Sequence, residues 1–192
     1  MDILVQVISV PNYKIIMIHR LLVILSIALL PLVATAQNRV EVTDPEIKFS
    51  YSLPEGWQVK DDGYDYIIQS PDNQDTYISL TYVESAKGAD YLESLGGKQS
   101  FEEDFLFEIR YILTEDFSNL GVLENGSTTI DETKASWVKF SHGENGEHLG
   151  VFYMYQKLNQ TFKITGTAPA DQFEKVKPNF TAIINSFQAE KR

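Results

Sequence analysis

The most constraining feature of the sequence is a run of seven residues, Leu149-Gly-Val-Phe-Tyr-Met-Tyr155, in which both alternating sets of side chains are apolar. One set holds Leu149, Val151, Tyr153 and Tyr155, and the other holds Phe152 and Met154. A strand with one apolar face needs cover on that face only, whereas a strand with two apolar faces needs cover on both. The run therefore predicts a central strand of a sheet that lies between two layers.

Further strands are predicted on both sides of this run. Apolar and polar residues alternate from Ile47 to Leu53, and Pro54-Glu-Gly56 after them has the composition of a turn. Residues 37–45 lack a pattern of this kind and are predicted to be a short leader into the fold. Other extended segments are predicted at 57–59, 64–69, 77–83, 120–130, 135–142, 147–158 and 161–168.

Two helices are predicted, one in the middle of the chain and one at its end. Ser100 and Glu103 match a capping box. The apolar residues after them follow a helical spacing: Phe105, Leu106, Ile109, Ile112 and Leu113. The last helix carries the stripe Phe173, Val176, Phe180, Ile183, Ile184 and Phe187, with Pro178 inside it. The order of strands, helix, strands and helix predicts an α+β fold, an α/β/α sandwich with a central, mostly antiparallel sheet of about six to eight strands and helices on both faces.

The first 36 residues have the pattern of a secretory signal peptide. His19-Arg20 precedes an apolar run at 21–32, and Val33-Ala-Thr-Ala36 supplies a small-x-small cleavage site. The run is shorter than the roughly 20 residues of a spanning helix, which disfavours the alternative of an uncleaved anchor. We therefore expect cleavage after Ala36, a secreted or periplasmic product, and one domain at 37–192. Met17 is an alternative start for the same signal peptide.

Composition narrows the partners and the chemistry. The chain has no cysteine, so it has neither a disulfide nor a thiol nucleophile, and no lipid can be attached through an N-terminal cysteine. We expect no stable membrane anchor after cleavage. The net charge of −11 disfavours nucleic acid and anionic lipid surfaces as partners. No cofactor motif is legible, and neither G-x-S-x-G nor H-E-x-x-H occurs.

Two histidines flank a predicted hairpin turn and raise the question of a metal site. Asn145-Gly146 is a strong signal for a two-residue type I′ turn. Such a turn would pair His142 with Leu149 and place His142 and His148 on opposite faces of the sheet. This register disfavours a shared metal ion, although a bulged turn would bring the two histidines together.

Three further sets of side chains are candidates for binding. Asp61, Asp62 and Asp65 form the densest acidic loop, but they lack the spacing of an EF-hand and remain a weak alternative to the prediction of no metal site. Trp57, Tyr64 and Tyr66 are candidates for the rim of a ligand cleft between sheet and helix. The aromatic residues of the 135–158 hairpin, Trp137 among them, are interpreted as core, with a ligand slot as the alternative.

The chain resembles the PsbP-like superfamily. The resemblance lies in Ile47-Lys-Phe-Ser-Tyr-Ser-Leu-Pro-Glu-Gly-Trp57, in Ile183-Ile-Asn-Ser-Phe187, and in the paired segments 135–140 and 151–167. That superfamily is similar in fold to the extrinsic PsbP protein of photosystem II, the Ran-binding Mog proteins and bacterial DcrB-like envelope proteins. It implies an α/β/α sandwich with no established catalytic set. Many bacterial members look like lipoproteins, and this chain departs from them by lacking the cysteine.

Three functions follow as expectations. The first is an exported, non-enzymatic domain that binds a protein partner or assists a complex of the cell envelope. The alternative is a periplasmic protein that binds a small ligand or a metal ion. The third is a hydrolase, with a Ser–His–acid triad assembled from distant residues.

Overall fold

A computed structural model of the protein describes residues 38–45, 47–61, 66–85 and 100–190, so the predicted signal peptide and Met17 lie outside the described residues. The longer of its two sheets contains β3 (Gln58–Asp61), β4 (Tyr66–Gln69), β5 (Tyr77–Glu84), β6 (Gly121–Ile130), β7 (Thr133–His142), β8 (His148–Lys157) and β9 (Gln160–Pro169). The smaller sheet contains β1 (Asn38–Thr43), β2 (Lys48–Leu53) and β10 (Gln188–Glu190). The helical elements are α3 (Phe101–Phe107), the π-helical η1 (Glu108–Ile112), α4 (Leu113–Asp116), the 3-10 turn η2 (Glu144–Gly146) and α5 (Phe173–Ser186).

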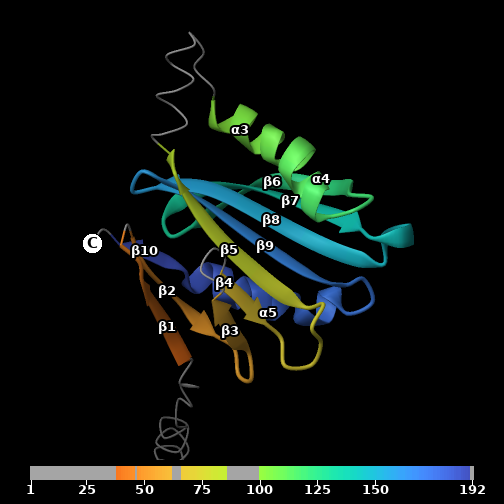
Figure 1. The fold of residues 1–192 in the computed structure, drawn as a ribbon, viewed down its shortest axis with the longest axis horizontal. Coiled ribbons are helices and arrows are strands. Elements are labelled where there is room, and N and C mark those ends of the chain that lie inside the picture. The colour runs from red at the N-terminus through yellow and green to blue at the C-terminus, as the bar shows by residue number, and fades with distance from the viewer. Residues whose placement is uncertain (1–37, 46, 62–65, 86–99, 191–192) are drawn as a thin grey trace, which may run out of the picture. The chain divides into compact units, whose positions relative to one another are not determined.

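The strands of the main sheet lie in the order β3-β4-β5-β9-β8-β7-β6, and every neighbouring pair is antiparallel. The segment α3–η1–α4 covers one face of this sheet, while α5 and the small sheet cover the other (Figure 1). The predicted α+β fold, with a central antiparallel sheet between helical layers, is confirmed. None of the helices among the described residues is long and apolar enough to cross a membrane.

The 149–155 run packs against a core on each face of the sheet, as its alternation predicts, although Leu149, Val151 and Tyr153 are only half-buried. It forms most of β8, which lies between β7 and β9. Phe152 and Met154 belong to the core under α3–η1–α4, where the rings of Phe152 and Phe105 stack with their centroids 5.9 Å apart. Tyr155 belongs to the other core, beneath α5 and the small sheet, and its side chain is fully buried.

The small sheet is the part of the fold that the sequence did not predict. β1 forms from residues that were predicted to be a leader, and it pairs along the whole of β2. β10 pairs with the other side of β2, at 48–50. The Arg39 guanidinium joins the three strands by donating to Ser50 Oγ at 2.6 Å and to the side-chain oxygen of Gln188. β1 and β10 are short and mostly exposed, so their own residues carry little of the alternation that marks a strand.

The middle helical segment begins where predicted, and Phe105 and Leu113 are buried as predicted, but the buried set differs from the predicted one at two positions. Ser100 and Glu103 form both hydrogen bonds of the capping box. Leu106, which was predicted to face the core, is 54% exposed, because neighbouring residues of a helix point about 100° apart and Phe105 occupies the inward direction. Glu108 is buried instead and accepts from Lys163 Nζ of β9 at 2.7 Å.

The β7–β8 hairpin differs from its predicted register by one residue. The connection is not a two-residue turn: it includes η2, with positive φ at Gly143, Asn145 and Gly146. The longer loop pairs His142 directly with His148, so the two side chains share one face of the sheet. The prediction that they lie on opposite faces is therefore wrong, because a slip of one residue transfers every side chain to the other face.

Candidate functional site

A groove of about 410 Å³ lies between α5 and strands β6, β7 and β8. We call it the Trp137 groove. Its lining residues come from four elements and combine aromatic, aliphatic and charged side chains: Glu124, Trp137, Lys139, Val151, Tyr153, Phe173, Glu174, Lys177, Phe180 and Thr181.

The floor of the Trp137 groove follows from the alternation of two neighbouring strands. Trp137 and Lys139 are two residues apart on β7, so they lie on the same face of the sheet. The register pairs Trp137 with Tyr153 and Lys139 with Val151, which places all four side chains on the α5 face. None of the four is fully buried.

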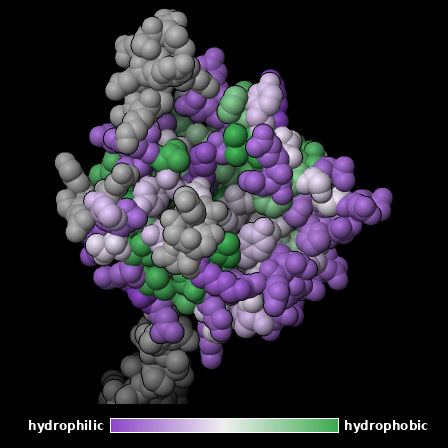
Figure 2. Space-filling view, in the orientation of Figure 1, coloured by the Kyte–Doolittle hydropathy of each residue, from purple (hydrophilic) through white to green (hydrophobic). Residues whose placement is uncertain are grey.

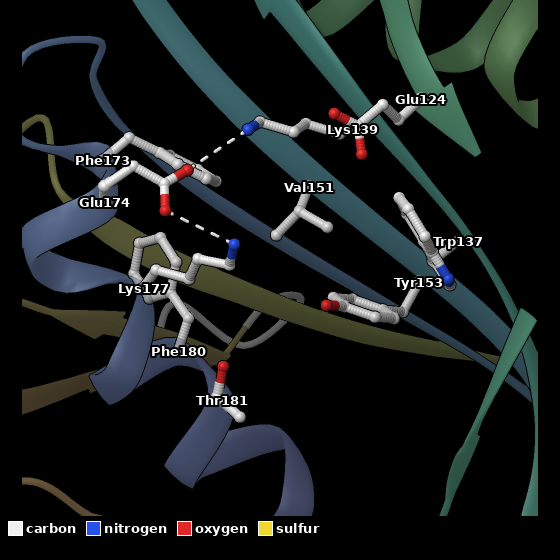
Figure 3. Close-up of a pocket in the computed structure, with 10 residues that line it drawn as sticks. All are labelled: Glu124, Trp137, Lys139, Val151, Tyr153, Phe173, Glu174, Lys177, Phe180 and Thr181. Carbon is white, nitrogen blue, oxygen red and sulfur yellow. Dashed lines mark hydrogen bonds and ion pairs between the residues drawn. The ribbon is translucent and has the colours of Figure 1, made fainter. Parts of the chain in front are cut away.

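The wall of the groove comes from α5, and an ion-pair cluster lies where it meets the floor. Glu174 accepts from Lys139 Nζ at 3.3 Å and from Lys177 Nζ at 3.4 Å, so one carboxylate joins β7 to α5 (Figure 3). Hydrogen bonds from Lys139, and then from Lys177, lower the pKa of the exposed Glu174 carboxyl. Lys139 Nζ also lies 5.2 Å from the centroid of the Phe173 ring, within the range of a cation–π contact.

Trp137 lies at the other end of the groove from Glu174, on the side of the edge strand β6 (Figure 3). Its register partner on β6 is Gly126, and the indole lies over it. A Cβ atom added at Gly126 would be 3.1 Å from Cε2, Cζ2 and Nε1 of Trp137. Tyr153 packs beside this end, and burial raises the pKa of its hydroxyl.

These properties suit the binding of a group that combines an apolar surface with charge. Trp137, Val151 and Tyr153 offer a surface for an apolar side chain or a ring, and the charged end offers both ammonium donors and a carboxylate acceptor.

The two histidines of the β7–β8 hairpin form a second polar cluster, on the opposite face of the sheet. Their rings stack, with centroids 5.1 Å apart and planes 21° apart, and His142 Nε2 lies 2.7 Å from Oγ1 of Thr167. Burial, and then the neighbouring His148, lower the pKa of His142. No group of three or more potential metal ligands occurs among the described residues.

Comparison with known families identifies the fold. The family model of PsbP matches residues 37–189, which is most of the chain. The chain belongs to the PsbP family. Its PsbP domain therefore includes all ten residues that line the Trp137 groove, and it ends beyond α5, within β10.

Two solved structures are similar in fold to this PsbP domain. It is similar to CyanoP, the cyanobacterial PsbP of Synechocystis sp. PCC 6803, with a TM-score of 0.54 and 14% identity over 80% of this chain and 94% of that one. It is also similar to the Ran-binding protein Mog1p of Saccharomyces cerevisiae, with a TM-score of 0.50 and 9% identity over 80% of this chain and 96% of that one. At these identities the likeness concerns the fold alone. The comparison with curated protein sequences gives no match.

Of the predicted binding residues, the structure describes the side chains of Trp57 and Tyr66, and neither belongs to the lining of the Trp137 groove. Trp57 is 6% exposed, and its ring meets that of Phe180 edge to face at 6.0 Å. Tyr66 packs edge to face on Phe49 at 5.2 Å. Tyr64, Asp62 and Asp65 lie outside the described residues, as does the side chain of Asp61. A ligand rim at Trp57, Tyr64 and Tyr66 stays a prediction.

The sequence favoured the core for Trp137 and left a ligand slot as the alternative, and the structure places Trp137 in the lining of the groove. A signal was present, because a glycine within a strand often marks the close approach of another group, and Gly126 lies within β6. Only the register shows that the approaching group is the Trp137 indole.

Proposed function

We propose that this PsbP domain is a non-enzymatic accessory module that binds a partner protein in the cell envelope. The observation that carries the proposal is the position of Trp137, a partly exposed indole at the border between the groove and the edge of the sheet. Tryptophan is enriched among the residues that dominate binding energy at protein interfaces, where its ring fills a pocket and its N–H bonds an acceptor.

Further features support a protein partner. Mog1p, which shares the fold, is described as a Ran-binding protein. The predicted signal peptide supports an exported product. The face of the molecule in Figure 2 is mainly hydrophilic, and its apolar residues lie in separate patches. A small hydrophobic anchor with polar surroundings is typical of reversible interfaces.

Chemical crosslinking in the envelope fraction of the source cell, followed by affinity purification of the tagged full chain, tests this proposal. We expect one partner to be recovered with the wild type and lost with Trp137→Ala. Tyr111→Ala is the matched control, because Tyr111 is an aromatic residue of η1, 51% exposed, in the layer on the other face of the sheet. Failure of the wild type to recover any partner in repeated experiments would contradict the proposal.

A second candidate function is the binding of a small ligand. The volume of the Trp137 groove, about 410 Å³, lies within the usual range of ligand sites, and apolar and charged groups converge in it. Native mass spectrometry of the purified chain tests this function. A bound small molecule that is present in the wild type and absent from Trp137→Ala would favour it over a protein partner.

A further inference from the structure

We propose that β6 is an open docking edge, to which an extended segment of the partner protein adds as a further strand of the main sheet, with Trp137 as its anchor. This inference rests on the proposed function and specifies how the partner is held. Strand addition is an established mode of peptide recognition, in which main-chain hydrogen bonds supply affinity and side-chain contacts supply specificity.

The first argument is the exposure of β6. It has ten residues and pairs with β7 along one side, and no other strand among the described residues pairs with it. Every residue from 122 to 129 is exposed, including Val122 at 51% and Leu123 at 52%. The outer side of β6 therefore presents a row of backbone N–H and C=O groups to which an extended chain can bond.

The second argument is that β6 lacks most of the features that protect edge strands. Its one bulge lies near its start, between Val122 and Glu124, and Glu124 is its single charged residue. The stretch 125–129 has neither a charge nor a proline. β3, at the opposite edge of the same sheet, is four residues long and carries Lys60 and Asp61. Short length and inserted charge are the usual protections, and β3 has both.

The third argument is the anchor. Because Gly126 has no side chain, the Trp137 ring extends over β6, where it occupies the position of the missing side chain. A residue of an added strand opposite Gly126 would place its Cβ about 5 Å from that position, close enough for a large side chain to touch the indole. No hydrogen bond involving Trp137 Nε1 is present among the described residues, which leaves this donor for a partner acceptor.

The charges in and around β6 indicate which kind of segment binds there. The segment 121–132 contains no lysine or arginine, and Glu124 and Glu132 are exposed within it. The whole chain carries a net charge of −11. These charges favour a basic segment with an aromatic or large aliphatic residue opposite Gly126. They disfavour a second copy of this chain, which would bring two acidic edges together.

The test uses random peptides about as long as β6, selected by display on the full chain, then synthesised with a fluorophore and titrated by anisotropy. We expect basic peptides whose binding protects the β6 amides from hydrogen exchange. N-methylation of alternate peptide amides, Trp137→Ala and Ser127→Lys should each weaken binding tenfold or more. Gln58→Lys is the matched control, because it places the same charge on an exposed residue of the other edge, and it should leave the affinity unchanged.

The inference is overturned if no peptide is selected, if bound peptides protect other amides, or if Ser127→Lys and Trp137→Ala leave the affinity unchanged. Ser127 is exposed, so its replacement reports on the edge even if Trp137→Ala fails to fold. An envelope partner that Ser127→Lys still recovers in full would overturn the docking edge and leave the proposed function standing. A wild-type dimer that Ser127→Lys dissociates would assign the edge to a second copy, and would also overturn the inference.

Discussion

Gly150 tests how closely the two strands at the centre of the sheet are packed. It pairs with Phe140 of β7, whose ring is fully buried. A Cβ atom at position 150 would lie 2.3 Å from Cζ of Phe140, 2.6 Å from Cε2 and 2.9 Å from Cε1. Gly150→Ala therefore cannot be accommodated unless the ring or the strand moves.

The cost of that movement follows from the neighbours of the ring. Carbon atoms in contact are normally about 3.5 Å apart, so the Phe140 ring must retreat by roughly 1 Å. Phe117 and His142 occupy its surroundings, with ring centroids at 5.2 Å and 5.7 Å. Overpacking of this kind costs about 1–3 kcal/mol, while replacing a strand glycine returns about 0.5–1 kcal/mol. We expect a net loss of about 1 kcal/mol in the free energy of unfolding, and a fall of about 2–4 °C in the unfolding temperature.

Urea and thermal unfolding, followed by circular dichroism, measure this loss. The double variant Gly150→Ala/Phe140→Leu removes Cζ and both Cε atoms, so it should recover about 1–2 kcal/mol relative to the sum of the single variants. Gly121→Ala is the matched control, because its Cβ would meet only the Ser141 hydroxyl, at 3.1 Å, and the change should stay within about 0.5 kcal/mol. If Gly150→Ala behaved like this control, or Phe140→Leu gave no relief, the packing argument would be refuted.

Three further predictions concern buried polar groups. Glu108→Ala should lower the free energy of unfolding in urea by about 2 kcal/mol, because it leaves the largely buried Lys163 ammonium without its carboxylate. The double variant Glu108→Leu/Lys163→Met should restore most of that loss. Equal stability of Glu108→Ala and the wild type would contradict this prediction. Burial lowers the pKa of His142 below 6.5 in the folded state. The neutral His142 side chain therefore contributes its full stability above about pH 6.5. This contribution is lost as the pH falls through the pKa of the unfolded state and then through that of the folded state. Between about pH 7 and about pH 5, the unfolding temperature of His142→Gln should therefore fall less than that of the wild type. If the two unfolding temperatures differed by the same amount at both pH values, the prediction would be wrong. Asp131→Ala should speed hydrogen exchange at the Ala189 amide, which donates to Asp131 Oδ2 at 2.7 Å. Unchanged exchange at this amide would show that the bond does not hold β10.

Local patterns in the sequence were sufficient to predict the elements that form the main layers. The alternation in 149–155 predicts a strand with two covered faces, and β8 has them. Ser100 and Glu103 predict the start of a helix, and the capping box forms. These signals lie within a few residues of one another, and the side-chain periods of 2.0 and 3.6 residues follow from backbone geometry alone.

The small sheet depends on contacts between distant parts of the chain. β1 and β10 come from the two ends of the domain and become strands because β2 offers an edge to each. Asp131, in the turn after β6, accepts from the Ala189 amide of β10. No local pattern encodes these pairings, since each strand is too short to show its own alternation clearly.

The register of the main sheet, and with it the candidate site, was decided only by the tertiary structure. Asn145-Gly146 predicted a two-residue turn, but the loop between β7 and β8 is longer than that. The pairing of β7 with β8 therefore differs by one residue from the predicted pairing, and Trp137 lies opposite Tyr153. The separate register of β6 with β7 places the Trp137 indole over Gly126, and Glu174 reaches Lys139 from α5. Sequence alone determined which segments are strands and helices, because that depends on local periodicity. Which side chains meet at the Trp137 groove depends on one-residue differences in register, and these are settled by packing across the whole sheet.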